Sequence, residues 1–316
     1  MSLNLKTYLV LLFALSLSFA ASATDEEALR NFALIDDTEA VEKLLKQGTS
    51  ADSPTKFGKS ALMFAAEEDN EDVMLLLIRY GADVNAVSVA GCTALTFASE
   101  TGNQTIVDML LQKNASTQPK TRAGWDALMI ATQTGHPGIV HILIEHGAQV
   151  NTSDKHGKTP LMLASAAGYA DIVQRLIESG AYIYLRDKDH ASALMLAAEK
   201  GHMKTIRLLL DAGANVNALD NDGTSALFWA AENDLSLTVE QLADNGANID
   251  HQDVDGVTAL MSAVISEAEA SVTMLLELGA NPEIKDMSGQ GALEYSRKNQ
   301  HKRIEALIQS STELQK

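Results

Sequence analysis

The sequence has 316 residues, with 24 basic side chains, 42 acidic ones and a net charge of −18. This charge argues against a protein that binds nucleic acid or anionic lipid, since both are themselves negatively charged. The single cysteine, Cys92, excludes an internal disulfide framework and leaves either a free thiol or a bond to another chain.

The first 23 residues have the pattern of a secretory signal. Lys6 precedes an uncharged apolar run, TYLVLLFALSLSF, and Ala21 and Ala23 occupy the small-residue positions of a cleavage site. An uncleaved membrane anchor is the alternative, but the run is shorter than the roughly 20 residues that a membrane span needs. We therefore predict a signal peptide over residues 1–23 and export to the periplasm, with secretion as the alternative. Without this segment the net charge is −19, and no membrane association is expected after cleavage.

From Gly48 to Gly289 the chain repeats itself every 33 residues. GADVNA at residues 81–86 returns as GAQVNT, GANVNA and GANIDH. Asn114 and His190 fill the single gaps in two registers of glycine, which comprise Gly48, Gly81, Gly147, Gly180, Gly213, Gly246 and Gly279, and Gly58, Gly91, Gly124, Gly157, Gly223, Gly256 and Gly289. A repeat without insertions predicts a solenoid, in which each unit packs only on its neighbours.

Residues 147–179 show what one repeat contains. GAQVNTSDKHG is rich in turn-forming residues and predicts a finger-like loop or short hairpin. Thr159 can cap a helix that begins at Pro160 and ends at Gly168. A second helix, amphipathic and opening at Asp171, ends at Gly180. Both helices are too short to be stable alone, so each must bury its apolar face against the next repeat.

Polar helix pairs flank the array. Residues 24–48 and 289–316 each predict a capping helix pair, as the ends of a solenoid need a polar outer face. Between them, residues 49–288 hold seven repeats.

The 33-residue unit resembles the ankyrin repeat. The motifs that carry this resemblance are GKTPLMLASAAGY from Gly157, ASALMLAAEKGH from Ala191 and GADVNA from Gly81. The resemblance covers nearly all of the chain beyond the signal. It implies an all-α solenoid of stacked antiparallel helix pairs with short β-hairpin or loop fingers and a concave face. The chain resembles the small exported ankyrin-repeat proteins of Gram-negative bacteria, some of which are thought to support oxidative-stress defence.

The chain departs from the family pattern where the family carries a histidine. Five repeats have methionine there and two have other residues, namely Met63, Met129, Met162, Met195, Met261, Thr96 and Phe228. These methionines form a stripe along the repeats. If the stripe had a function of its own, it would bind a soft metal or scavenge oxidant. We interpret it instead as core packing, because methionine fills irregular gaps. The seventh repeat also lacks glycine between its helices (ISEAEAS, residues 265–271), which leaves room for a different packing there.

No pattern of catalytic or metal-binding residues is present in the sequence. The histidines have no zinc-ligand spacing, and His136 and His202 match the structural Gly-His turn of the family. Phosphate-binding, dinucleotide-binding and nucleophile-elbow motifs are absent from the sequence. We predict no catalytic residues, no metal, no cofactor and no enzymatic activity.

The resemblance implies that a partner binds to the finger tips and to the exposed part of each first helix. Three consecutive fingers are basic within an acidic protein. Trp125 stands at a finger position where we expect exposure, and tryptophan and arginine are common interface hot spots. The predicted partner-binding residues are Trp125, Lys120, Arg122, Lys155, His156, Lys158, Arg186 and Lys188. Later fingers offer Asp220, Asp222, Asp253 and Asp255 instead.

We therefore predict a non-catalytic scaffold for protein–protein interaction. Its partner is a protein with an acidic docking site that binds the concave finger face. One alternative is a secreted effector or inhibitor that acts on a host or rival protein. Another is an oxidative-stress accessory protein, which would need solvent-exposed methionines.

Overall fold

The computed structural model describes residues 24–314, so the predicted signal peptide over residues 1–23 lies outside the described residues. Contacts divide the chain into an N-terminal unit that ends at Gln149 and a C-terminal unit that begins at Val150. We describe each unit by itself.

Within residues 24–314, none of the helices combines the length and the apolar character that crossing a membrane requires.

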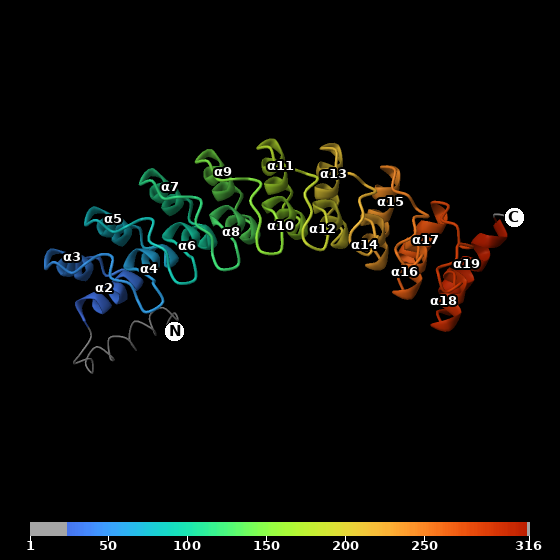
Figure 1. Cartoon of the computed structure of the whole chain (residues 1–316), viewed down its shortest axis with the longest axis horizontal. Coiled ribbons are helices and arrows are strands. Elements are labelled where there is room, and N and C mark those ends of the chain that lie inside the picture. The colour runs from blue at the N-terminus through green and yellow to red at the C-terminus, as the bar shows by residue number, and fades with distance from the viewer. Residues whose placement is uncertain (1–23, 315–316) are drawn as a thin grey trace, which may run out of the picture. The chain divides into compact units, whose positions relative to one another are not determined.

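The N-terminal unit is a stack of antiparallel helix pairs (Figure 1). In chain order the pairs are α2 (Asp25–Leu34) with α3 (Thr38–Lys46), α4 (Ala61–Glu67) with α5 (Glu71–Arg79), α6 (Ala94–Thr101) with α7 (Gln104–Gln112), and α8 (Ala127–Thr134) with α9 (Pro137–Glu145). The first helices of the pairs pack on one another in order, from α2 to α8. Each helix therefore buries its apolar side against its own pair and the adjacent one.

The C-terminal unit continues the same pattern. Its pairs are α10 (Pro160–Ala167) with α11 (Ala170–Glu178), α12 (Ala193–Glu199) with α13 (Met203–Asp211), α14 (Ala226–Glu232) with α15 (Ser236–Asp244), α16 (Ala259–Ile265) with α17 (Glu269–Glu277), and α18 (Ala292–Lys298) with α19 (Lys302–Leu314). The first helices again pack in order, from α10 to α18. Both units are thus all-α solenoids, as the repeat predicted.

Most first helices begin at a side chain that caps them. Ser60, Thr93, Asp126, Thr159, Ser192 and Thr258 each accept the backbone N–H three residues further on. Pro160 occupies the first turn of α10, and Gly168 ends that helix in the left-handed conformation, as predicted. The second helix, α11, begins at Ala170, one residue earlier than predicted from Asp171.

The turn between the helices of a pair requires one left-handed residue. Glycine holds this position at Gly102, Gly135, Gly168 and Gly201, while Asp36, Asp69, Asp234, Glu267 and Gln300 hold it in the other pairs. Glu267 adopts a φ of 59°, so the seventh repeat forms the usual turn without glycine and α16 packs on α17. Our expectation of a different packing there was wrong. Asn114 and His190 are also left-handed, which confirms their place in the two glycine registers.

The methionine stripe lies in the core. Met63, Met129, Met162, Met195 and Met261 are 0–1% exposed, and Thr96 and Phe228 are 2% exposed. This confirms the packing interpretation and gives no support to oxidant scavenging by the stripe. Met203 and Met287, which lie outside the stripe, are 38% and 81% exposed.

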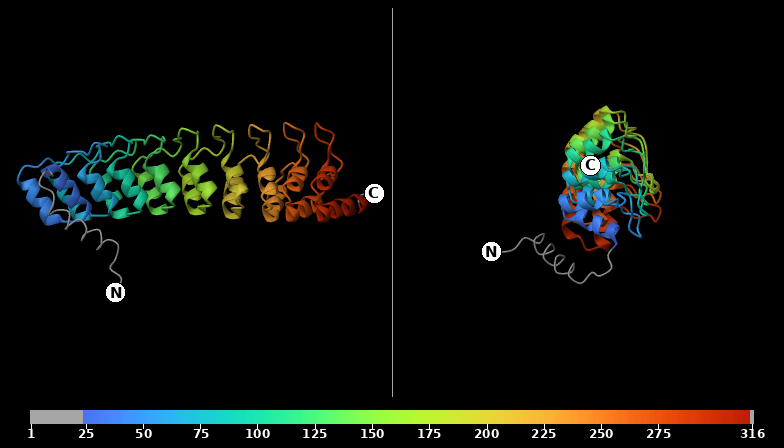
Figure 2. Two further views of the ribbon diagram at one scale, coloured as in Figure 1. Left: turned by 90° about the horizontal axis from the view of Figure 1, so that it is seen from below. Right: turned by 90° about the vertical axis from the view of Figure 1, so that its left-hand side faces the viewer.

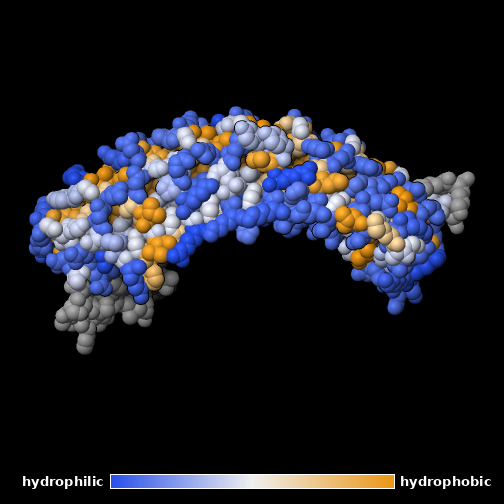
Figure 3. Space-filling model, in the orientation of Figure 1, coloured by the Kyte–Doolittle hydropathy of each residue, from blue (hydrophilic) through white to orange (hydrophobic). Residues whose placement is uncertain are grey.

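The finger loops project from one side of the helices in each unit (Figure 2). Among the described residues, β-type pairing is limited to the isolated bridges Arg186 with Ser192 and Gln252 with Thr258. The fingers are therefore turns rather than two-stranded hairpins. Hydrophilic residues dominate the visible surface around them, with scattered hydrophobic patches (Figure 3).

Candidate functional site

Each finger ends in the same five-residue turn. The side chain at its first position accepts the backbone N–H of the fifth residue, whose carbonyl in turn accepts the N–H of the first. These first residues are Thr55, Ser88, Thr121, Asp154, Asp187, Asp220, Asp253 and Asp286. Asp220 and Asp253, two of the acidic residues noted on the later fingers, therefore hold their turns together. Asp222 and Asp255 remain as exposed acids at the tips.

Backbone hydrogen bonds join consecutive fingers within each unit. In the N-terminal unit the N–H of Val89 donates to Phe57 O and that of Arg122 to Ala90 O, both at 2.8 Å. The C-terminal unit repeats this bond between Lys188 N–H and His156 O at 2.9 Å, and it continues along the later fingers at Asn221, Val254 and Met287. The finger tips are therefore held in register, and their side chains stand on a fixed backbone frame.

The N-terminal unit carries three of the predicted binding residues. Lys120 and Arg122 are exposed on the third finger, as predicted. Trp125 is half-buried, and its backbone N–H donates to Thr121 Oγ1 at 3.2 Å. Trp125 is thus less exposed than expected, because part of its side chain packs against the protein.

An aromatic and cationic cluster on the same unit was missed by the sequence reasoning. The Lys59 ammonium lies 4.3 Å from the ring centroid of Phe64 and 4.4 Å from that of Phe97, and it pairs with Glu67. Cation–π contact and the ion pair together fix Lys59 between first helices α4 and α6. The signal that could have found it is a repeated aromatic position, because Phe64, Phe97, Trp229 and Tyr295 are separated by multiples of 33 residues.

The C-terminal unit carries the other five predicted residues. Lys155, His156 and Lys188 are exposed at finger tips, and Lys158 is half-buried. Arg186 is exposed, but its guanidinium donates to the Leu219 carbonyl of the next finger. Part of its hydrogen-bonding capacity is therefore used within the protein.

A recess of about 430 Å³ lies further along the C-terminal unit. Its lining includes Trp229, Glu199 and Glu232. The indole N–H of Trp229 lies 2.9 Å from both Asp220 Oδ2 and Thr224 Oγ1, which fixes the ring orientation. A tryptophan face beside two carboxylates suits a cationic side chain. The C-terminal unit thus has basic fingers at its start and an acidic recess beyond them.

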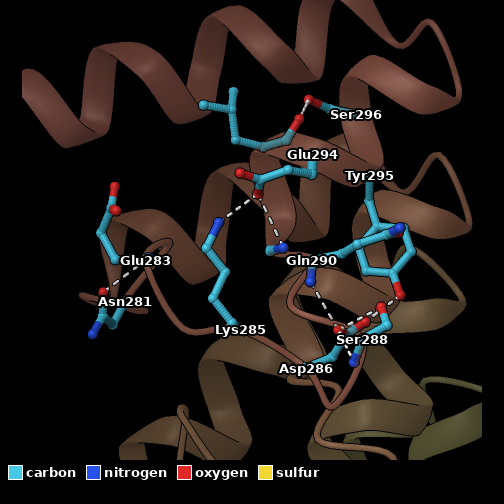
Figure 4. Close-up of polar contacts among 11 residues, drawn as sticks. Asn281, Glu283, Lys285, Asp286, Ser288, Gln290, Glu294, Tyr295 and Ser296 are labelled. Atoms are coloured by element: carbon cyan, nitrogen blue, oxygen red, sulfur yellow. Dashed lines mark hydrogen bonds and ion pairs between the residues drawn. The ribbon is translucent and has the colours of Figure 1, made fainter.

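The last finger has a dense polar network (Figure 4). Asp286 accepts hydrogen bonds from the Tyr295 hydroxyl, from Ser288 at 2.8 Å and from the Gln290 N–H at 2.9 Å. Burial raises the pKa of Asp286, but these hydrogen bonds outweigh it and bring the pKa down from 3.8 to about 2. The hydrogen bond to Asp286 raises the pKa of Tyr295. Lys285 pairs with Glu294 at 2.6 Å and lowers the pKa of that carboxyl.

The histidines at the Gly-His turns contact the preceding repeat. His136 Nε2 lies 3.2 Å from Glu100 O, and His202 Nε2 lies 3.1 Å from Ala166 O. Both are structural, as predicted. Within residues 24–314, no three or more His, Cys, Asp or Glu side chains are grouped so as to hold a metal ion. Cys92 is half-buried in the turn of the second finger.

Comparison with family models decides the family. The model for ankyrin repeats in three copies matches residues 29–121, 114–187 and 183–253, and the single ankyrin-repeat model matches residues 255–287. The chain is an ankyrin-repeat protein. None of the curated proteins compared with this ankyrin-repeat protein matches it. The ankyrin repeats indicate a scaffold for protein–protein interaction.

Proposed function

We propose that this ankyrin-repeat protein is an exported scaffold whose partner protein docks on the finger tips and the adjoining face of the first helices. The observation that carries the proposal is that the fingers share the backbone of their turns but differ in the side chains at their tips. All eight fingers share one backbone turn, while the tip residues range from lysine and arginine to valine, methionine and aspartate. A fixed frame loses little conformational freedom on binding, so the varied tips are suited to recognition.

Charge supports a partner that is acidic where it docks. Lys120 and Arg122 are exposed on the N-terminal unit, and Lys155, His156 and Lys188 are exposed on the C-terminal unit. These basic tips stand out in a chain of net charge −18. Complementary charge steers association and excludes wrong partners. The signal pattern of residues 1–23 supports a site of action in the periplasm or beyond.

The test is capture of partners by the purified protein from periplasmic extract. One variant, called the strip variant, reverses the charge of four exposed basic residues at the finger tips, namely Lys120→Glu, Arg122→Glu, Lys155→Glu and Lys188→Glu. A matched control reverses the charge of four exposed basic residues on the second helices or directly after them, namely Lys43→Glu, Lys113→Glu, Arg175→Glu and Arg207→Glu. We expect the wild type and the control to retain one partner that the strip variant loses.

Retention of the same partner by the strip variant would contradict docking at the basic tips. A partner found only in culture medium or in extract of a host or rival cell would instead favour the secreted effector or inhibitor. Melting temperatures of the three proteins, compared first, show whether a lost partner reflects lost folding.

A further inference from the structure

Side chains in the GADVNA phrase connect neighbouring repeats. The carboxamide of Asn151 donates to Gly180 O at 3.1 Å and accepts the N–H of Tyr182 at 2.7 Å. Asn217 makes the same two bonds to Gly246 O and Asn248 N–H, at 3.0 and 2.8 Å. Asn85 does so in the N-terminal unit, with Asn114 O and Ser116 N–H. In each case one backbone carbonyl and one backbone N–H of the next repeat together bind a single asparagine side chain.

The fifth repeat, within the C-terminal unit, breaks this pattern. Tyr184 occupies the asparagine position, and a phenol ring does not offer a carboxamide. The backbone groups that the side chain would bind are Gly213 O and Asn215 N–H. Neither forms a hydrogen bond within the described residues, and both residues are exposed.

Two tyrosines line the same pocket as these backbone groups. The rings of Tyr182 and Tyr184 stack at 5.5 Å between centroids with 15° between planes. They are 51% and 75% exposed, respectively. Together with Arg186, Leu194, Gly213 and Asn215 they line a pocket of about 350 Å³. Exposed tyrosines offer a large rigid contact surface and are enriched where proteins bind one another.

We propose that this pocket binds an asparagine side chain presented by an extended segment of a partner protein. The carboxamide donates to Gly213 O and accepts the Asn215 N–H, as Asn151 and Asn217 do at their own junctions. The stacked rings of Tyr182 and Tyr184 contact the segment beside the asparagine. This site lies beside the junction between α13 and the following finger rather than at the finger tips, so it does not depend on the proposed docking at the basic tips.

The chain itself indicates the side-chain preference of such a site. Gln118 stands at the asparagine position of the third repeat, yet its amide donates to Thr117 Oγ1 and makes neither bond to the backbone of Gly147 or Gln149. Asp250 reaches only the N–H of Asn281, at 2.9 Å, because a carboxylate has no hydrogen to donate to a carbonyl. The pocket should therefore prefer asparagine to both glutamine and aspartate.

The probe is a capped peptide of sequence GAQVNTS, copied from residues 147–153, in which Asn151 is the only asparagine. Its matched controls carry Gln, Asp or Ala in place of that asparagine. Binding is followed by the NMR shift of the Asn215 amide in the purified, isotope-labelled protein. We expect the asparagine peptide to shift this amide and to bind about tenfold more tightly than the controls. Equal binding by all four peptides, or no shift of Asn215 at millimolar peptide, would overturn the proposal.

Two variants locate the effect. Tyr184→Asn restores the side chain used at the other junctions, so it should occupy Gly213 O and Asn215 N–H from within and abolish peptide binding while raising the melting temperature. Tyr184→Phe keeps the stacked ring and should bind as the wild type does. Undiminished binding by Tyr184→Asn would show that the peptide lies elsewhere. Partner capture through the basic tips should be unaffected by Tyr184→Asn, which separates this proposal from the proposed function.

Discussion

At the scale of single residues, the finger carboxylates have a structural task. Asp187 and Asp286 are among the few buried acids, and each accepts two backbone N–H groups of its own turn. A carboxylate accepts these hydrogen bonds more strongly than a neutral carboxyl group does. The turn held by Asp286, whose pKa is lowered to about 2, should therefore weaken in acid.

Tyr295→Phe tests this dependence at Asp286. Removing the hydroxyl deletes one hydrogen bond to the carboxylate and should lower the free energy of unfolding at neutral pH by about 1 kcal/mol. The folded pKa of about 2 lies below the ordinary 3.8, so the contribution of Asp286 is present above about pH 3.8 and lost as the pH falls through about 2. Urea unfolding of both proteins across the acid range should show their difference shrinking. A difference that is the same at every pH would point to lost packing of the ring instead.

At the scale of elements, close stacking of the fingers restricts the glycines of the turns. Gly91 has a φ of +84°, and a Cβ there would collide with the carbonyl oxygen of Lys120 in the next finger. Gly81 has a nearly equal φ of +88°, but a Cβ there would meet open space. The first glycine is needed both for its backbone conformation and for the approach of the next finger, the second only for its conformation.

Substituting each glycine by alanine separates these two requirements. Gly81→Ala should lower the free energy of unfolding by about 1 kcal/mol, which is the strain of a left-handed alanine. Gly91→Ala should lower it by clearly more, since the third finger must also shift to relieve the collision. Denaturant unfolding of the two variants provides the comparison. Equal losses would mean that the fingers separate easily and do not form a fixed frame.

At the scale of the whole molecule, acidic charge is in large excess. The 42 acidic side chains outnumber the 24 basic ones, and several of the ion pairs among the described residues lie on the exposed surface. Exposed ion pairs contribute little to the free energy of unfolding. Repulsion among the excess carboxylates is therefore the larger electrostatic effect on folding.

Added salt should therefore stabilise the protein. Screening over a Debye length of about 10 Å at about 0.1 M salt weakens the repulsion between carboxylates on the same surface. We expect the melting temperature to rise by a few degrees between low salt and about 0.2 M sodium chloride, as followed by circular dichroism. A fall on adding salt would show that attractive pairs such as Lys59 with Glu67 dominate instead.

Most of the fold could be predicted from the sequence because it rests on local rules. Helix starts follow from capping side chains such as Thr159, and the turns follow from left-handed positions such as Asn114 and His190. These capping and turn positions recur every 33 residues along the chain, and this period identifies the solenoid. Of the candidate site, the exposure of five finger-tip residues could be predicted, namely Lys120, Arg122, Lys155, His156 and Lys188.

Some features were decided only by the tertiary structure, because they depend on contacts between residues of neighbouring repeats. The partial burial of Trp125 follows from how its side chain packs in three dimensions. The bond from Arg186 to Leu219 and the unpaired backbone groups of Gly213 and Asn215 depend on the position of the next repeat. The sequence by itself determined the register of the repeats, because capping and left-handed turns act within a few residues. The tertiary structure decided which side chains remain available to a partner, because each repeat covers part of its neighbour.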